Sequence, residues 1–440
     1  MSERKKIVYI GGGSLYFEIV TAELATTSGM PPLDVYFYDI DAERNDIMCR
    51  VGERVAAKTG ADIQCFQTTN MKQALDGADF AIASVGVHGP NREWHLADSK
   101  VCARYGIITT TGDTVGPSGL SQGLRLIPAI VDIVKKLEKY SPNCIFLNHS
   151  NPMSPVIRAV AKYSKIHAVG YCHNWSHARD LVANALDIDK EEIDMRIAGV
   201  NHMGWLLALY HRGIDIYPAF RQKLKRLGPK KLGTNIFARE VCETQGYFPI
   251  GGDRHIIEFF PHARSYDSIK KLPYKMQWRG DMIKSQLLEA EISKGTSKIH
   301  EKADGRAEVW LPTPEQRSPE SMGEQIMCLL GHKEMNHYVI TENRGAVPNL
   351  PDWAALEMKA VISNRGARSI HVGEMPAQLA RWTLPQIYAH ELIIEAAVEK
   401  NREKAIQAMA SDPMIRDFKE ARKVFDAIVK VHGERLKEFK

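Results

Sequence analysis

The sequence predicts an α/β protein that begins with a doubly wound parallel sheet and continues into an α+β domain. Short apolar runs alternate with helical patterns through the first half of the chain. A glycine-rich turn follows the first apolar run. Strands that alternate with helices are typical of a parallel sheet with helices on both faces.

The elements can be placed along the chain from hydrophobic periodicity and turn residues. Strands are expected at residues 7–10, 35–38, 80–85, 144–147 and 168–171, and helices at 18–26, 124–139, 377–400 and 418–439. Near residue 195 apolar and polar residues begin to mix, which favours antiparallel strands. We therefore expect one domain over 1–195 and a second over 196–440. The basic stretch 221–234 is expected to be a mobile surface loop.

Composition excludes several classes of function. The 440 residues carry a formal net charge of +5 and no block of like charges, so no nucleic-acid partner is expected. No apolar run reaches the length of about 18 residues that a membrane span needs, and no secretory signal is recognised. Seven scattered cysteines indicate free thiols and a reducing, cytoplasmic location.

The segment VYIGGGS indicates a nucleotide site in a Rossmann-type domain. Gly11 and Gly13 let the backbone approach a pyrophosphate, and Ser14 leads into the helix whose amino end would face it. Tyr16 stands where the third glycine of the usual pattern would be. Asp39 ends the next strand, where a carboxylate binds ribose hydroxyls and repels a 2′-phosphate, so NAD is favoured over NADP. The alternative is a tight turn beside a surface aspartate.

Polar segments that follow predicted strands should meet at the carboxyl edge of the sheet. Among them, GYCHNWSH contains Cys172, and GVNHMGW contains His202. A thiolate and an imidazole on neighbouring segments could form a metal site with open positions. A small core cysteine and a hydrogen-bonded core histidine are the alternatives. His255 and Glu258 are interpreted first as structural, with a part in binding metal or substrate as the alternative. Asp113 is interpreted as a turn residue, with the positioning of substrate as its alternative role.

Together these motifs resemble glycoside hydrolase family 4. The resemblance runs from IGGGS through GDTVGPSG, the NP at Asn151–Pro152 and the Cys-His pair to NHM and the DP at Asp412–Pro413. It implies a lactate/malate-dehydrogenase-like fold, with NAD and a divalent metal, usually Mn²⁺, as cofactors. A first domain for NAD and a second for substrate, metal and subunit contacts would follow. Relatives form homodimers and homotetramers, and the partner would be a small glycoside.

The resemblance also implies roles for individual residues. Cys172 and His202 match the metal ligands, Asn151 the amide that touches substrate hydroxyls, and Gly11, Gly13 and Asp39 the cofactor site. Arg92 lies in the loop that faces the substrate, and Tyr247 is the candidate for the base. His173 stands where phospho-glycosidase members have Asp or Asn, which implies a non-phosphorylated, α-linked hexoside or hexuronide. Asn174 and Trp175 depart from the known subgroups, so the sugar stays open.

The implied mechanism follows from acidity. Oxidation of sugar C3 by NAD makes a ketone, which acidifies the C2 hydrogen, and a divalent metal stabilises the resulting enolate. A base removes the C2 proton, the glycosidic oxygen leaves with a proton from an acid such as His173, and NADH returns the hydride. Tyr247 as base would need its pKa lowered from about 10.

Two other functions remain open at this point. A 2-hydroxy-acid dehydrogenase of lactate/malate type would use Arg92, Asp98 and His202, but it has no use for Cys172. A non-enzymatic NAD sensor would keep the glycine turn and Asp39 and need no metal. Accumulation of NADH with lactate or malate would indicate the dehydrogenase. Metal analysis of the purified protein would separate the sensor, which needs no metal, from the hydrolase.

Overall fold

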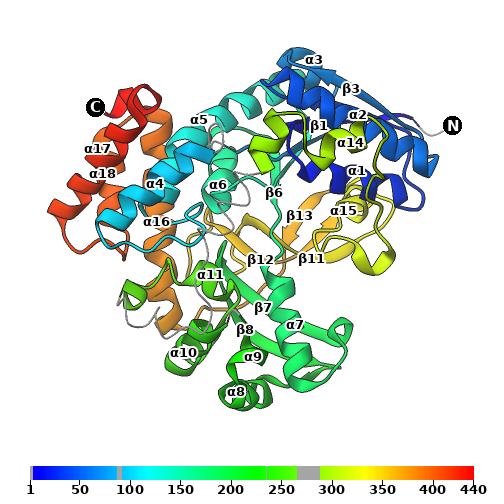
Figure 1. Cartoon of the computed structure of the whole chain (residues 1–440). Coiled ribbons are helices and arrows are strands. Elements are labelled where there is room, and N and C mark those ends of the chain that lie inside the picture. Colours follow the sequence, from blue (N-terminus) through cyan, green and yellow to red (C-terminus); the bar gives the residue numbers. More distant parts are fainter. Residues whose placement is uncertain (1–2, 87–91, 234, 265–287) are drawn as a thin grey trace.

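The computed structural model describes residues 3–86, 92–233, 235–264 and 288–440. In this part of the chain thirteen strands form one mixed sheet (Figure 1). They are β1 Lys5–Ile10, β2 Leu33–Tyr38, β3 Ile63–Thr68, β4 Phe80–Ala83, β5 Ile145–Asn148, β6 His167–Gly170, β7 Ile193–Val200, β8 Met203–His211, β9 Ile214–Asp215, β10 Phe248–Pro249, β11 Met335–Glu342, β12 Ala355–Ser363 and β13 Gly366–Ser369.

The first six strands are parallel and lie in the order β3-β2-β1-β4-β5-β6. This is the strand order of dinucleotide-binding sheets, in which ligands lie at the carboxyl ends where the order reverses. Here the reversal falls between β1 and β4. The predicted doubly wound parallel sheet is confirmed, and β3 is a further strand that the sequence pattern did not reveal.

Helices cover both faces of the parallel half, because alternate residues of each strand point to opposite faces. Ile7 and Tyr9 pack in one apolar cluster with residues of α1 (Tyr16–Thr26) and α2 (Ala42–Thr59). Val8 and Ile10 pack in another with α3 (Met71–Leu75), α5 (Gly116–Tyr140) and α6 (Met153–Tyr163). Residues 7–10 of β1, which follow its two lysines, are apolar or aromatic because both faces of the strand are buried there.

The remaining strands extend the same sheet as an antiparallel half in the order β11-β12-β7-β8-β10. The two halves meet at one residue pair, Ile340 on β11 with Gly170 on β6. The predicted change to antiparallel pairing is therefore found. Residue 195 lies inside β7, and the domain division placed there stays a prediction.

The remaining helices form three groups around these elements. Those near β7 and β8 are α7 Asn174–Leu186, α8 Tyr217–Arg226, α9 Pro229–Leu232, α10 Ile236–Gln245 and α11 Gly252–Ile256. Those at the other end are α4 Glu93–Arg104, α16 Ala377–Glu399, α17 Arg402–Ala410 and α18 Phe418–His432, while α14 Lys298–Ala303 and α15 Met322–Leu329 pack against the parallel half.

Two corrections concern the predicted elements. The stretch 221–234 was predicted as a mobile loop, and residue 234 lies outside the described residues. Most of 221–233 instead belongs to α8 and α9, and Phe220 and Leu224, four residues apart, bury one face of α8. The pattern at 418–439 divides into α18 and a short 3₁₀ segment, Gly433–Phe439. None of the described helices combines the length and apolar character that crossing a bilayer requires.

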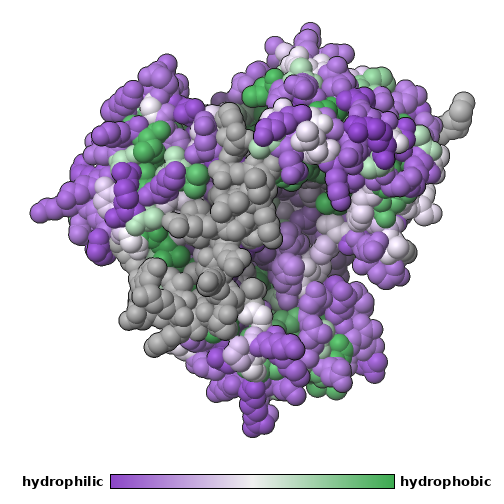
Figure 2. Space-filling model, in the orientation of Figure 1, coloured by the Kyte–Doolittle hydropathy of each residue, from purple (hydrophilic) through white to green (hydrophobic). Residues whose placement is uncertain are grey.

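The face in Figure 2 is mainly hydrophilic, with apolar residues scattered over it. It is hollowed between the parallel half above and the helices α7, α8 and α9 below.

Candidate active site

The glycine turn after β1 has the geometry that its sequence predicts. Gly11 has φ of +81°, and a Cβ there would lie 2.5 Å from the carbonyl oxygen of Ser84. The amide of Gly13 donates to Asp39 Oδ2 at 2.9 Å, and the Ser14 and Ser84 hydroxyls lie 2.9 Å apart. The backbone thus passes close to β4 and leaves no room for side chains, as a turn that faces a pyrophosphate requires.

Tyr16 replaces the expected third glycine for a reason that the structure reveals. Its hydroxyl donates to Glu320 Oε2 at 2.7 Å and lies 3.3 Å from His149 Nε2. Glu320 comes from a segment just before α15, so this tyrosine joins the start of α1 to a distant part of the chain. A glycine there would lose this connection.

Three side chains that can bind a metal converge beyond the ends of the parallel strands. Asp113, His202 and His255 each offer a ligand atom, and these atoms lie within 4.8 Å of one another. Asp113 precedes α5, His202 precedes β8 with φ of +69°, and His255 lies on α11. The two imidazole rings have centroids 3.8 Å apart. The structure thus brings together one predicted ligand, His202, and two residues that were not assigned as ligands.

The protonation states of these groups suit a divalent cation. Burial lowers the pKa of His202 to about 4 and that of His255 well below its usual value, so both rings are neutral at pH 7. Thr114 donates its hydroxyl hydrogen to Asp113 Oδ1 at 2.9 Å, and its oxygen lies 2.6 Å from His202 Nδ1. That oxygen therefore accepts from His202 Nδ1–H, which leaves a lone pair on Nε2. Orienting contacts of this kind are typical around metal-binding histidines.

Glu258 fixes the loop that carries Asp113. Its fully buried carboxylate accepts hydrogen bonds from the amides of Thr110, Thr111 and Gly112, the last two at 2.9 Å. Burial raises the pKa of Glu258 to about 7. The sequence interpretation of Glu258 as structural agrees with these contacts, whereas His255, on the same short segment, faces the cluster.

Cys172 lies beside the cluster and is connected to it through two other side chains. Cys172 is buried, and burial raises the pKa of its thiol well above the usual value. The side-chain amide of Asn201 donates a hydrogen bond to its sulfur. Asn201 Nδ2 also donates to Glu357 Oε2 at 3.0 Å, and Glu357 accepts from the amide of His202. Cys172 is not one of the three groups that converge within 4.8 Å in the described part of the chain, so its role as a ligand stays a prediction.

The predicted substrate residues lie on the same side of the sheet. Asn151 Nδ2 donates to Asp113 Oδ2 at 3.1 Å, whereas Asn151 Oδ1 is buried with no partner among the described residues. Arg92 is close enough to Asp113, Arg44 and Glu289 for their charges to act on it, and its buried Nε likewise has no described partner. A buried polar atom without a partner is costly, so these atoms are suited to a bound ligand.

His173 lies beside Cys172, half exposed. Its Nδ1 is 3.4 Å from Glu320 Oε1, and this contact raises the pKa of His173. His173 therefore keeps a proton more readily than a free imidazole would. Glu320 contacts Tyr16 as well, so one carboxylate touches both the nucleotide turn and the segment after β6.

Tyr247 lies away from the metal-binding cluster. Its ring forms an edge-to-face pair with Tyr217 at 6.2 Å, against the large apolar core of the antiparallel half. Since Phe248 pairs with Leu206, Tyr247 lies level with residue 207 of β8, roughly 16 Å along the strand from His202 at about 3.3 Å per residue. The structure places Tyr247 in this packing, and its role as base stays a prediction.

The sequence interpretation did not assign Glu320 or Glu357 to the site, and it gave Asp113 and His255 a part in the site only as the second alternative. The i, i+3 spacing of His255 and Glu258 signalled a shared helical face, but it could not show which residue faced the cluster. Glu320 and Glu357 lie far along the chain from the residues they contact. No local pattern distinguishes them from surface carboxylates.

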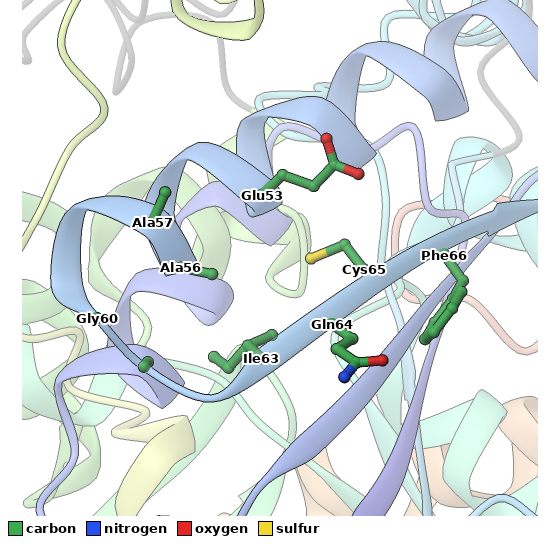
Figure 3. A pocket seen from close by; sticks show the side chains of 9 residues that line it. Glu53, Ala56, Ala57, Gly60, Ile63, Gln64, Cys65 and Phe66 are labelled. Carbon is green, nitrogen blue, oxygen red and sulfur yellow. The ribbon is translucent and has the colours of Figure 1, made fainter.

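The hollow drawn in Figure 3 lies elsewhere. It has a volume of about 600 Å³ and lies between α2 and the edge strand β3, lined by residues such as Ala56, Gly60, Cys65 and Phe66. Gly60 and Ile63 belong to the amino-terminal side of β3, away from the carboxyl ends where the cluster lies. This hollow is therefore not part of the candidate site.

Comparison with known proteins agrees with the geometry. The sequence model described as "Family 4 glycosyl hydrolase" matches residues 6–188, and that of its C-terminal domain matches residues 197–415. The chain is 27% identical to an α-galactosidase of Bacillus subtilis (strain 168), over 99% of this chain and 100% of the relative. It is 28% identical to an α-galacturonidase of Lachnoclostridium phytofermentans, over 94% and 92%.

A similar solved structure is a 6-phospho-α-glucosidase from gut microorganisms in complex with NAD and Mn²⁺. It has a TM-score of 0.80 and 22% identity, over 98% of this chain and 99% of that one. At this identity the likeness concerns the fold. The two matches of the family's models together span most of the chain, and the chain is therefore a glycosidase of glycosyl hydrolase family 4.

Proposed function

We propose that this enzyme hydrolyses α-linked, non-phosphorylated hexosides or hexuronides and that it uses NAD and a divalent metal, with Mn²⁺ as the first candidate. The observation that carries the proposal is the convergence of Asp113, His202 and His255, with Asn151, whose Oδ1 has no partner among the described residues, in contact with Asp113. A metal site and a dinucleotide site at one sheet edge suit a reaction in which both act on one sugar.

The relatives support the choice of substrate and cofactors. The α-galactosidase and the α-galacturonidase align with this chain over more than nine-tenths of its length. The 6-phospho-α-glucosidase of the same fold binds NAD and Mn²⁺. That enzyme is named for a phosphorylated sugar, so the test below compares phosphorylated with non-phosphorylated substrates.

The residues present are suited to these cofactors. When bound, NAD supplies a hydride acceptor for sugar C3, and the metal supplies a Lewis acid for the sugar oxygens. His202 would hold the metal through a ring nitrogen, with Asp113 and His255 as the partners that the structure brings near, and with Cys172 as the resemblance implies. Gly11, Gly13, Ser14 and Asp39 would form the cofactor site.

Other side chains would act on the substrate itself. Asn151 Oδ1 would accept a hydrogen bond from a sugar hydroxyl, and Arg92 would bind a further oxygen or the carboxylate of a uronide. His173, whose pKa is raised by Glu320, would hold the proton that the leaving oxygen needs.

The test is a panel of p-nitrophenyl glycosides. It contains α- and β-galactosides and glucosides, the α-galacturonide and the 6-phosphates of the hexosides, each with and without NAD⁺, Mn²⁺ and a reducing thiol. The proposal expects cleavage of a non-phosphorylated α-glycoside that requires NAD⁺ and metal, with at least about a hundredfold loss in Cys172→Ser.

Each contrary outcome is distinct. Cleavage confined to 6-phosphates would overturn the substrate class, and cleavage without NAD⁺ would overturn the mechanism. Sustained NADH formation with lactate or malate, together with no cleavage, would indicate the dehydrogenase instead.

A further inference from the structure

Two residues of opposite charge flank the cofactor turn and have no assigned function. Arg44, on the first turn of α2, donates from Nε to the carbonyl oxygen of Gly13 at 2.8 Å. Its two terminal nitrogens both contact the carboxylate of Glu289, one of them at 3.2 Å. Glu289 lies 245 residues away in the sequence, in the half of the chain outside the parallel sheet.

Arg44 and Asp39 lie against the same point of the turn. A Cβ on Gly13 would lie 2.8 Å from Arg44 Cγ and 3.1 Å from Asp39 Oδ2. In dinucleotide-binding sheets the carboxylate that ends the second strand binds the ribose 2′-hydroxyl, whereas an arginine near it accommodates the 2′-phosphate of NADP. This chain therefore has both residues, and their partners determine which one acts.

The partners of Arg44 leave it poorly available to a phosphate. Nε is occupied by the turn, and the planar fork of the guanidinium is occupied by Glu289, in the two-point geometry that a phosphate would otherwise take. The side chains of Arg44 and Glu289 are 27% and 22% exposed, so bulk water screens the pair only in part. Glu289 and Asp39 also place two negative charges where a 2′-phosphate would come.

We infer that the Arg44–Glu289 ion pair makes the cofactor site selective for NAD over NADP, with Glu289 as the residue that keeps the arginine from a 2′-phosphate. The inference rests on the proposed use of NAD. It goes beyond that proposal because cofactor choice then depends on a residue of the second half of the chain and not on Asp39 alone.

The experiment measures cofactor affinity directly. NAD⁺ and NADP⁺ are titrated by calorimetry into the full chain and into Glu289→Gln, which removes the charge and keeps the shape. The ratio of the Kd for NADP⁺ to the Kd for NAD⁺ should fall at least about tenfold in the variant, because a repulsive carboxylate is lost and an arginine is released. The Kd for NAD⁺ itself should change less than about threefold.

Matched variants separate this effect from general damage. Glu291→Gln, on an exposed residue of the same segment, should leave the ratio unchanged. Adding Arg44→Met to Glu289→Gln should remove the gain in NADP⁺ affinity, because the released guanidinium is then absent. Glu289→Ala should shift the ratio in the same direction as Glu289→Gln, and circular dichroism confirms that each variant is folded.

The outcomes distinguish the inference from the function on which it rests. An unchanged ratio in both Glu289 variants, with NAD⁺ still bound, would overturn the inference alone. Equal affinity of the unmodified enzyme for NAD⁺ and NADP⁺ would do the same. No binding of NAD⁺ by the unmodified enzyme would overturn the proposed function and this inference with it.

Discussion

The carboxylate of Glu258 supports three consecutive backbone amides, those of Thr110, Thr111 and Gly112. Glu258→Ala would leave these buried donors without an acceptor, and each such group costs about 1–3 kcal/mol. We expect a loss of at least about 3 kcal/mol in the free energy of unfolding, measured by urea denaturation, and a smaller loss for Glu258→Gln, whose amide oxygen still accepts.

The matched control for Glu258 is Glu240→Ala, because Glu240 is exposed on α10. It should change the free energy of unfolding by less than about 0.5 kcal/mol. An equal loss in both variants would show that the contacts of Glu258 do not stabilise the loop.

Asp113 and His255 should contribute to metal affinity although neither was expected to be a ligand. Their ligand atoms converge with that of His202 within 4.8 Å. Asp113→Asn and His255→Ala should each weaken Mn²⁺ binding by about 10- to 100-fold, measured by calorimetry on the full chain. His300→Ala, on α14 beside Ser297, is the control and should leave the affinity unchanged. Unchanged affinity in the first two variants would mean that the metal is held without them.

Sequence reasoning can place residues together when they are close along the chain. The turn at Gly11 and Gly13 and the carboxylate of Asp39 were predicted because strand, turn and helix follow one another in the chain, and the structure brings the turn and Asp39 into contact. Sequence reasoning did not find Glu320, because its partner Tyr16 is 304 residues away. A contact between residues so far apart does not affect the local pattern of apolar and polar residues.

Among the elements, α18 is held to α4 and α5 by a buried charged group. Asp98 accepts from His432 Nε2 at 2.7 Å and from Arg125 Nη2 at 2.9 Å, and all three side chains are nearly inaccessible. Burial raises the pKa of Asp98, but the hydrogen bond from His432 and the charge of Arg125 outweigh burial and lower it below its usual value.

Removing this carboxylate should destabilise the chain in a pH-dependent way. Asp98→Asn leaves Arg125 without its counter-ion, and breaking a buried pair costs about 3–5 kcal/mol at pH 7. Because the folded pKa lies below the unfolded value of about 3.9, the stabilisation is full above that value and disappears as the pH falls through the folded pKa.

Urea denaturation of both proteins at pH 7 and at successively lower pH values below about 4 checks this expectation. The difference in the free energy of unfolding between the unmodified chain and Asp98→Asn should become smaller as Asp98 of the unmodified chain is protonated. Asp132→Asn, in the exposed pair with Lys136 on α5, is the control and should cost less than about 1 kcal/mol. A difference that does not vary with pH would contradict the assigned role of the charge.

The elements themselves were predicted best where the periodicity is strong. The helices at residues 377–400 and 124–139 correspond to α16 and to most of α5, because amphipathic patterns of that length have few alternatives. The edge strand β3 was missed, since its partly exposed residues alternate only weakly, with Phe66 and Gln67 both exposed. The short helices α8 and α9 were hidden by the lysines and glycines around them.

At the scale of the whole molecule, the parallel half is completed by residues from the second half of the chain. The apolar cluster that contains Phe17 and Val20 of α1 also contains Met322 and Ile326 of α15, all fully buried. Glu23 of the same helix accepts from the amides of Ser318 and Met322 at 2.7 and 2.8 Å. The sequence predicts the doubly wound parallel sheet, but it does not predict that the chain returns to cover one of its faces.

This arrangement predicts that the fragment 1–195 does not fold by itself. Without the second half, the face of α1 that contacts α15 is exposed, and each buried aliphatic or aromatic side chain that returns to water costs about 1.5–3 kcal/mol. The cut also falls inside β7 and removes β11, which leaves β6 as an open edge. We expect the fragment to aggregate or to lack near-ultraviolet circular dichroism, while the full chain shows a cooperative transition. A fragment that is monomeric, folded and able to bind NAD⁺ would instead show that residues 1–195 are an independent domain.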